Sequence, residues 1–250
     1  MIHLENEIAI VTGSSRGIGA DIAKSLAANG CKVAVNYRQS EDKANAVVEE
    51  IRRAGGTAVS VKADVTDKDQ VNRMAETVAG QFGHPTILVN NASSSMIAKK
   101  IAKTEWGEFE SCFAMAVKSA FNCCGAVTPQ MMKNRRGKIV NIVTQYSMGA
   151  PPIAMATYVT AKHALVGFSK SLAVELAPFG IQVNMVSPGF TETELVGHVP
   201  ESFRQSIAGQ TPLKRNALAS DTSNAVLYLV SGLSNFVTGI NLPVCGGNVM

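Results

Sequence analysis

Short runs of β-branched and other apolar residues alternate with longer segments in which apolar residues recur at helical spacing. The short runs have the length and composition of buried strands. They occur at residues 8–11, 32–36, 58–61, 86–89, 138–143, 181–186 and 240–244. Strands that alternate with helices are typical of a parallel sheet with crossover helices on both faces. The pattern therefore predicts an α/β fold with one doubly wound sheet.

The segments between these runs carry recognisable helix boundaries. Helices are expected at residues 17–29, 40–53, 67–82, 104–132, 157–177 and 220–230. Gly30 ends the first helix, Ser40 caps the second, and either Thr66 or Asp67 caps the third. Residues 190–211 show weaker periodicity and are expected to form a mobile excursion. Because no repeat, linker or low-complexity tract interrupts the pattern, we interpret residues 1–250 as a single domain.

Composition and charge exclude several classes of protein. The 250-residue chain is 46% hydrophobic and 17% charged, which is incompatible with a disordered chain. Its net charge of +4 is spread along the sequence, so no nucleic-acid partner is expected. No apolar run approaches the roughly 18 residues that span a bilayer, and residues 1–10 do not resemble a signal peptide. The five cysteines lack metal-ligand spacing, so we expect reduced thiols, no metal site and a cytoplasmic protein without a membrane partner.

A glycine-rich turn lies between the first strand and the first helix and reads Thr12-Gly-Ser-Ser-Arg-Gly-Ile-Gly19. Gly13 permits a tight turn, while Gly17 and Gly19 let the backbone and the helix approach a dinucleotide pyrophosphate closely. The helix N-terminus adds N–H donors and a favourable dipole. The position directly after a buried strand makes this turn a candidate phosphate cradle of a Rossmann-type fold. Its candidate cofactor-binding residues are Gly13, Ser15, Arg16, Gly17, Ile18 and Gly19.

The end of the second strand favours NADP over NAD. An NAD site usually has a carboxylate there for the ribose 2′-hydroxyl, but this strand runs out as Asn36-Tyr37-Arg38. Arg38 and Arg16 are able to attract a 2′-phosphate through charge-assisted hydrogen bonds, although both also fit the description of solvated surface arginines. Asp64 and Val65, which follow the third strand, are expected to contact the adenine.

Five motifs in this order resemble the short-chain dehydrogenase/reductase family, in particular its 3-oxoacyl-thioester (acyl-carrier-protein) reductase branch. They are residues 12–19, Asp64-Val65, Asn90-Asn91-Ala92, Tyr158-x-x-x-Lys162 and Ser187-Pro188-Gly189, and together they extend over most of the chain. The resemblance implies NADPH-dependent reduction of a ketone, whose substrate is a small molecule or an acyl thioester, free or bound to a carrier protein. It also implies a homotetramer and a substrate-covering loop within residues 190–211. The further cofactor contacts that it implies are Asn91, Ala92, Tyr158, Lys162, Pro188, Gly189 and Thr191.

Tyr158 and Lys162 are the candidate acid–base pair. Reduction of a ketone needs a proton donor at the developing alkoxide, and a free tyrosine with a pKa of about 10 is a poor acid at neutral pH. A lysine at i+4 lies on the same helix face, and its ammonium is expected to lower the pKa of the phenol. The resemblance assigns proton donation to Tyr158, and it assigns contact with the nicotinamide ribose to Lys162.

The sequence departs from the family pattern at two site positions. The family has a serine at the end of the fifth strand: counting along the strand places Thr144 there, whereas counting back from the tyrosine places Gln145 there. We favour Thr144, because a loop absorbs an insertion more easily than a central strand does. A glutamine amide is nevertheless also able to donate to an oxyanion. Ala116 takes the place of a family asparagine that helps a water to link the lysine to solvent.

These departures leave two alternatives to the reductase hypothesis. The first is a cofactor-binding but catalytically weak subunit that supports an active partner. The second is non-redox chemistry, such as elimination or isomerisation, with Tyr158 and Lys162 as the acid–base pair. Relatives that abandon redox chemistry often lose the glycine cradle, and its retention here argues for a bound nucleotide.

Overall fold

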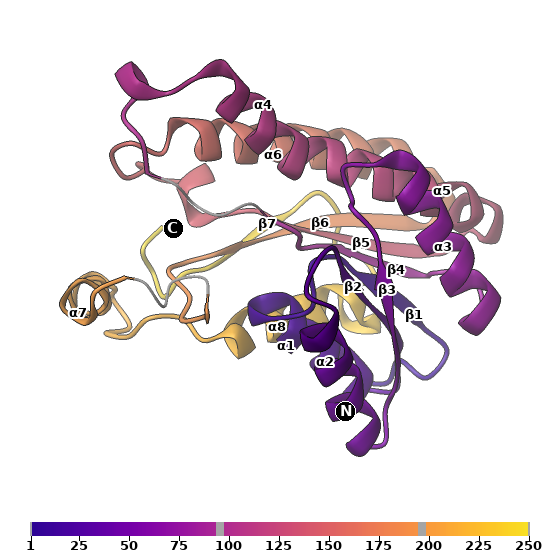
Figure 1. The fold of residues 1–250 in the computed structure, drawn as a ribbon. Helices are drawn as coiled ribbons and strands as arrows, with labels where there is room; N and C mark the ends of the chain where they lie inside the picture. Colours follow the sequence, from indigo (N-terminus) through magenta and orange to yellow (C-terminus); the bar gives the residue numbers. More distant parts are fainter. Residues whose placement is uncertain (1, 94–97, 195–198, 250) are drawn as a thin grey trace.

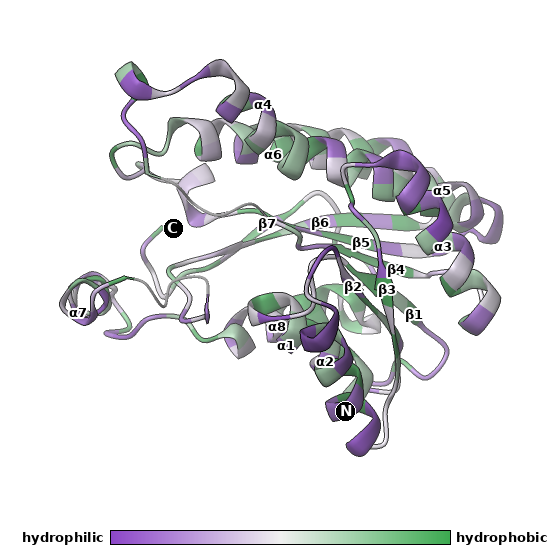
Figure 2. Cartoon of the chain, viewed as in Figure 1, coloured by the Kyte–Doolittle hydropathy of each residue, from purple (hydrophilic) through white to green (hydrophobic). Residues whose placement is uncertain are grey.

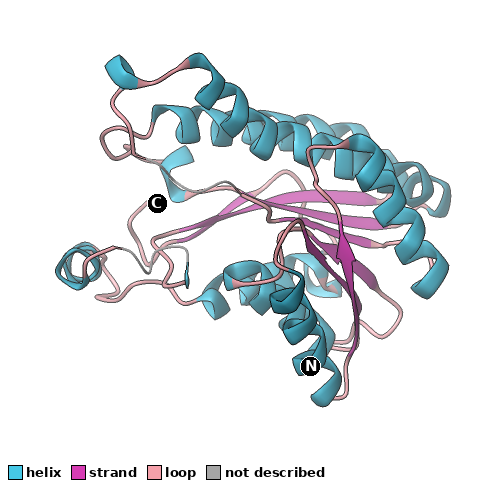
Figure 3. Ribbon diagram, viewed as in Figure 1, coloured by secondary structure: helices cyan, strands magenta, loops and turns pink. Residues whose placement is uncertain are grey.

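The computed structural model describes residues 2–93, 98–194 and 199–249. These residues include seven parallel strands that form one sheet in the order β3-β2-β1-β4-β5-β6-β7 (Figures 1 and 3). The strands are β1 (Ile8–Val11), β2 (Lys32–Tyr37), β3 (Thr57–Lys62), β4 (Ile87–Asn90), β5 (Gly137–Ile142), β6 (Ile181–Pro188) and β7 (Asn241–Val244). The predicted α/β class with a doubly wound sheet is confirmed. The strand order reverses between β1 and β4, which is where such sheets form a ligand-binding crevice at their carboxyl ends.

Helices cover both faces of the sheet (Figure 1). The α-helices are α1 (Gly17–Ala28), α2 (Glu41–Arg53), α3 (Lys68–Phe82), α4 (Trp106–Phe113), α5 (Ser119–Asn134), α6 (Ala156–Leu176), α7 (Glu201–Gln210) and α8 (Ala219–Val230). One layer contains α3, α4, α5 and α6, and the other contains α1, α2 and α8. Asp67 caps α3 by accepting hydrogen bonds from the backbone N–H groups of Asp69 and Gln70, so Asp67 and not Thr66 is the cap. Ser40 precedes α2 as predicted, but its side chain makes no capping hydrogen bond.

Apolar residues form a separate core on each face of the sheet. Ala9 and Val11 of β1 belong to the core beneath α1 and α2, whereas Ile10 belongs to the core beneath α3 and α5. Because both faces are covered, nearly all residues of the central strands β4, β5 and β6 are buried, and these strands read as largely apolar runs. Figure 2 shows the hydrophobic strands at the centre of the molecule and hydrophilic residues on the outer helix surfaces.

The single helix predicted over residues 104–132 is wrong in its middle. The structure divides this segment into α4, a π-helical turn (Ala114–Lys118) and α5. A π turn accommodates one extra residue within a helix, and such turns occur frequently at functional sites. Apolar spacing did not reveal it, because helical residues continue on both sides. Ala116 lies buried in this turn.

Helix α7 occupies most of the second half of the excursion expected over residues 190–211. No residue of α7 is fully buried, which explains why its sequence shows little apolar periodicity. In Figure 1 this helix lies apart from both helical layers, beyond the carboxyl ends of β6 and β7. Residues 195–198 lie outside the described residues, so the predicted mobility of the excursion stays a prediction.

The five cysteines carry free thiols, and the adjacent Cys123 and Cys124 are buried in α5, as the sequence predicted. Within residues 2–93, 98–194 and 199–249 no group of acidic, histidine and cysteine side chains is arranged to hold a metal ion. None of the helices described there has the length and apolar character needed to cross a membrane.

Candidate active site

The glycine turn opens onto the crevice between β1 and β4. Gly13 has a φ of +60°, a conformation that favours glycine, and a Cβ at this position would lie 2.9 Å from the Cα of Ala92. A Cβ on Gly19 would lie 2.7 Å from the carbonyl oxygen of Gly13 and would also clash with the Asn91 side-chain amide. The close approach predicted for this turn is therefore present. The N-terminus of α1 has no side-chain cap, so its N–H groups are free to bind an anion.

Two asparagine side chains hold the turn in place. The Oδ1 of Asn36 accepts a hydrogen bond of 3.0 Å from the Gly13 N–H, while its Nδ2 donates to the carbonyl of Ala63 at 3.1 Å. The Nδ2 of Asn91 donates to the carbonyls of Thr12 and Gly13, at 2.9 and 3.1 Å. Asn36 was not among the predicted site residues. The sequence feature that could have indicated Asn36 is its position as a polar residue near the end of an otherwise apolar strand, because a buried side-chain amide needs hydrogen-bond partners.

The predicted site residues converge on one cavity of about 340 Å³ along this crevice. All of them except Gln145 line it. These lining residues are Gly13, Ser15, Arg16, Gly17, Ile18, Gly19, Arg38, Asp64, Val65, Asn91, Ala92, Thr144, Tyr158, Lys162, Pro188, Gly189 and Thr191. Residues that are distant in the sequence are thus brought together at the carboxyl edge of the sheet.

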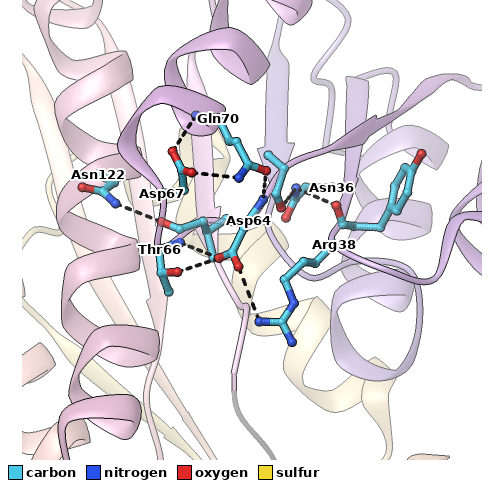
Figure 4. Close-up of polar contacts among 10 residues, drawn as sticks. Asn36, Arg38, Asp64, Thr66, Asp67, Gln70 and Asn122 are labelled. Atoms are coloured by element: carbon cyan, nitrogen blue, oxygen red, sulfur yellow. Dashed lines mark hydrogen bonds and ion pairs between the residues drawn. The ribbon is translucent and has the colours of Figure 1, made fainter.

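Figure 4 shows how Asp64 is held at the end of β3. Its Oδ1 accepts hydrogen bonds from the backbone N–H and the hydroxyl of Thr66, at 2.9 and 2.7 Å, and its Oδ2 lies 3.5 Å from the guanidinium of Arg38. Burial by itself would raise the pKa of Asp64, but the Thr66 hydrogen bonds and the Arg38 charge together hold that pKa below its usual value. The Arg38 side chain is 54% exposed. It is therefore anchored by Asp64 while part of its fork of N–H donors still faces solvent.

An ion pair that the sequence did not reveal joins the α2 side of the cavity to the segment after β6. It forms between Lys43 of α2 and Glu194, and Glu194 lines the cavity. Its hydrogen bond and the charge of Lys43, together with the charge of Arg16, lower the pKa of Glu194. The two partners lie far apart in the chain, so no local pattern pointed to their contact.

Tyr158, Lys162 and Thr144 lie together where α6 faces the end of β5. The Nζ of Lys162, whose side chain is buried, lies 5.9 Å from the centre of the Tyr158 ring. It donates a hydrogen bond of 2.8 Å to the backbone carbonyl of Ile142. The Thr144 side chain lies close enough to the Tyr158 phenol to lower its pKa. A phenol, a hydroxyl and an amine therefore meet on one wall of the cavity.

The pKa values of this cluster differ from the sequence-based expectation. Burial raises the pKa of Tyr158 to about 12, and the hydrogen bond with Thr144 opposes this rise without cancelling it. Burial lowers the pKa of Lys162 to about 8. The predicted lowering of the tyrosine pKa by Lys162 is thus wrong for this geometry, because removal from water dominates at both groups and disfavours both charged forms.

Of the two candidates for the serine position, the Thr144 side chain lines the cavity and the Gln145 side chain does not. Thr144 lines the cavity and contacts Tyr158. Gln145 is buried, and its Oε1 lies 3.2 Å from where a Cβ on Gly189 would be. That oxygen has no hydrogen-bond partner among the described residues. Of the two counts made on the sequence, the one taken along the strand agrees with this geometry.

Comparisons with known proteins match nearly the whole chain. Residues 13–248 match the family model described as enoyl-(acyl carrier protein) reductase. The 3-oxoacyl-[acyl-carrier-protein] reductase FabG of Staphylococcus epidermidis is 39% identical over 248 residues, which cover 98% of this chain and 100% of that protein. FabG of Escherichia coli K12 is 37% identical over 252 residues, with 100% of both chains covered.

Solved structures with a similar fold also match nearly the whole chain. A short-chain type dehydrogenase/reductase from Mycobacterium marinum has a TM-score of 0.91 and 32% identity, covering 98% of this chain and 96% of its own. The chain belongs to the short-chain dehydrogenase/reductase family. A 7α-hydroxysteroid dehydrogenase, solved with NADH and 7-oxo-glycochenodeoxycholic acid, has a TM-score of 0.93 and 31% identity, covering 99% of this chain and 96% of its own.

One departure from the short-chain dehydrogenase/reductase pattern lies directly behind the site. Ala116 of the π turn is buried and has no polar side chain, at the position where the family pattern has asparagine. A separate chain of buried amides crosses the sheet nearby: the Nδ2 of Asn90 donates to Asn141 at 2.8 Å, and the Nδ2 of Asn141 donates to the hydroxyl of Ser169 at 2.7 Å. These bonds link β4, β5 and α6, and so fix the helix that carries Tyr158 and Lys162 against the sheet.

Proposed function

We propose that this protein reduces a ketone to an alcohol with NADPH, and that the ketone is a 3-oxoacyl thioester. The observation that carries this proposal is the cluster of Tyr158, Thr144 and Lys162 on the wall of the cavity that also contains the glycine cradle. The thioester is supported by the two 3-oxoacyl-[acyl-carrier-protein] reductases whose sequences match over nearly all of this chain. On this basis the substrate is presented on a carrier protein or as a free thioester.

Tyr158 is the proton donor in this proposal. With a pKa of about 12 its phenol is neutral near pH 7, which is the form needed to protonate an alkoxide. Thr144 donates the second hydrogen bond to the same substrate oxygen. In its protonated form Lys162, 5.9 Å from the Tyr158 ring centre, stabilises the phenolate that remains after proton transfer.

The residues present fit a dinucleotide phosphate. When bound, NADPH supplies the hydride. Gly13 and Gly19 allow a close backbone approach that a Cβ at either position would prevent by clashing with neighbouring atoms. The uncapped N-terminus of α1 offers N–H donors to the pyrophosphate. Arg38, which is anchored by Asp64 and partly exposed, and Arg16, which lines the same cavity, are the groups suited to the 2′-phosphate.

We also assign roles to the rest of the chain. Residues 1–250 act as one domain, in which residues 190–211 cover the substrate. The protein assembles as a homotetramer through the long helical segment (α4 and α5) and the Tyr158–Lys162 helix (α6), and large apolar side chains exposed on α4 and α5 support this, because a monomer would leave them in water. Trp106 is 71% exposed and Phe121 is 59% exposed. Light scattering tests the assembly, and a monomer in solution would contradict it.

The free thiols are consistent with a cytoplasmic location.

Absorbance of NADPH tests the reductase proposal directly. Acetoacetyl-coenzyme A is mixed with NADPH and the wild-type protein, and the Tyr158→Phe variant is measured beside it. We expect turnover by the wild type and a loss on the order of 10²–10⁴ in the variant, because the acid is removed while the fold is kept. A wild type that binds NADPH but does not oxidise it would instead favour the weak-subunit alternative. A rise in activity on coexpression with an active homologue would then support that alternative.

A further inference from the structure

Tyr146 presents a second phenol to the reactive end of the cavity. It lines the cavity together with Thr144 and Tyr158 and is partly exposed to it. It is close enough to Tyr158 that a charge on Tyr146 raises the Tyr158 pKa. The proposed reaction uses Tyr158 and Thr144 at the ketone oxygen and assigns no function to the Tyr146 hydroxyl.

A short 3-10 turn (Gln145–Ser147) fixes the position of Tyr146. The Tyr146 N–H points at the Thr144 hydroxyl oxygen, 3.4 Å away, and the Ser147 hydroxyl donates to the Thr144 carbonyl at 2.8 Å. Gln145, between the two lining residues, is buried against Gly189. Thr144 and Tyr146 therefore face the same cavity from a turn that is tied back to the first of them.

The hydroxyl of Tyr146 is available for a ligand. It makes no hydrogen bond to any of the residues that the structure describes; only the backbone N–H of Tyr146 does so, toward Thr144. A tyrosine hydroxyl is able to donate one hydrogen bond and to accept others. A 3-oxoacyl thioester carries two carbonyl groups separated by one methylene carbon. A site with hydrogen-bond donors at two neighbouring points therefore matches such a thioester better than it matches a simple ketone.

We propose that Tyr146 is a specificity-determining residue that donates a hydrogen bond to the thioester carbonyl while Thr144 and Tyr158 hold the ketone oxygen. This inference rests on the proposed reduction of a 3-oxoacyl thioester and names the residue that selects it. It explains how the site distinguishes a ketone with a neighbouring carbonyl from one without. Tyr146 takes no part in hydride or proton transfer, so its removal acts on binding and not on the chemical step.

A pair of ligands that differ only in the second carbonyl tests this role. Acetoacetyl-coenzyme A is compared with 3-oxobutyl-coenzyme A, a thioether in which a methylene group replaces the thioester carbonyl. Calorimetry on the NADP⁺-loaded protein gives both dissociation constants without turnover. The variants are Tyr146→Phe, which removes only the hydroxyl, and Tyr228→Phe as a matched control on α8, outside the cavity lining.

We expect the wild type and Tyr228→Phe to prefer the thioester, and Tyr146→Phe to lose roughly tenfold of that preference, as expected for one neutral hydrogen bond. Steady-state kinetics should show the same loss in KM with kcat nearly unchanged. A wild type without preference, or a Tyr146→Phe protein that keeps it, would overturn the assignment. The two proposals fail separately: a Tyr146-dependent preference without NADPH oxidation contradicts only the reductase function, and turnover without this dependence contradicts only the role of Tyr146.

Discussion

The Nζ of Lys162 donates a 2.8 Å hydrogen bond to the backbone carbonyl of Ile142, the last residue of β5. This bond ties α6 to the strand end from which Thr144 projects two residues later. The same lysine lies 5.9 Å from the centre of the Tyr158 ring. Lys162 therefore ties α6 to the end of β5 and places an amine near the Tyr158 phenol.

The first prediction separates Thr144 from Gln145. Thr144→Val should lower kcat by a factor on the order of 10²–10³, because the second donor to the substrate oxygen is lost while the side-chain volume is kept. Thr144→Ser should stay close to wild type, since the hydroxyl remains. Gln145→Leu should change kcat less than tenfold, a factor smaller than the loss of one such donor. Steady-state NADPH oxidation measures all three, and a larger effect at Gln145 than at Thr144 would refute the assignment.

The second prediction concerns the pH dependence of stability at Lys162. Its pKa in the folded protein is about 8, below the ordinary lysine value of about 10.4. Between these values the unfolded chain binds more protons at this site than the folded one, so the free energy of unfolding rises with pH there. The contribution is about 3 kcal/mol, lost as the pH falls toward 8.

The measurement for Lys162 is urea unfolding of wild type and Lys162→Met at about pH 7 and about pH 10. The difference between the two proteins cancels the cysteines, whose pKa values are also shifted by burial. We expect the wild type to gain stability relative to the variant on going to high pH. A constant difference would mean that Lys162 is not desolvated as the structure indicates.

The third prediction concerns the glycine cradle. A Cβ on Gly19 would lie 2.7 Å from the Gly13 carbonyl oxygen and 2.9 Å from the Cα of Ser14, so the backbone would have to shift to accept it. Gly19→Ala should therefore weaken NADPH binding by at least tenfold, as measured by quenching of cofactor fluorescence. Gly80→Ala is the control, because Gly80 is exposed on α3 with open space around it. That change should leave binding intact and raise the free energy of unfolding by up to about 1 kcal/mol.

The fourth prediction addresses the choice of cofactor. Arg38→Ala should raise the KM for NADPH roughly tenfold or more while changing the KM for NADH little, because a charge-assisted hydrogen bond to a 2′-phosphate is lost. Arg52→Ala, which removes an exposed arginine of α2 that pairs with Glu49, serves as the matched control. An equal effect of Arg38→Ala on both cofactors would indicate that Arg38 supports the fold at Asp64 and does not read the phosphate.

Local patterns predicted much of the fold and of the candidate site. The apolar runs located the seven strands to within a few residues, because a strand buried on both faces needs side chains of one kind at every position. The glycine turn was located by its place after β1, and the i+4 spacing of Tyr158 and Lys162 put both on one face of α6. Each of these features depends on residues close together in the chain.

Features that depend on distant contacts were missed or wrong. The π turn at Ala114–Lys118 and helix α7 leave little trace in apolar spacing. The support of Gly13 by Asn36 and the pairing of Lys43 with Glu194 join segments that are remote in the sequence. The direction of the Tyr158 pKa shift was wrong, because the motif reveals the neighbouring lysine but not the burial of the phenol.

The sequence by itself determined the order of strands and helices along the chain, the position of the glycine turn and the placement of Tyr158 and Lys162 on one helix face, since all of these follow from periodicity and short-range spacing. Only the tertiary structure decided that Thr144 and not Gln145 faces the cavity, that Tyr146 stands beside them, and that burial sets the pKa values of Tyr158 and Lys162. Side-chain direction and desolvation are produced by the packing of α6 against β5, and a linear pattern does not contain that packing.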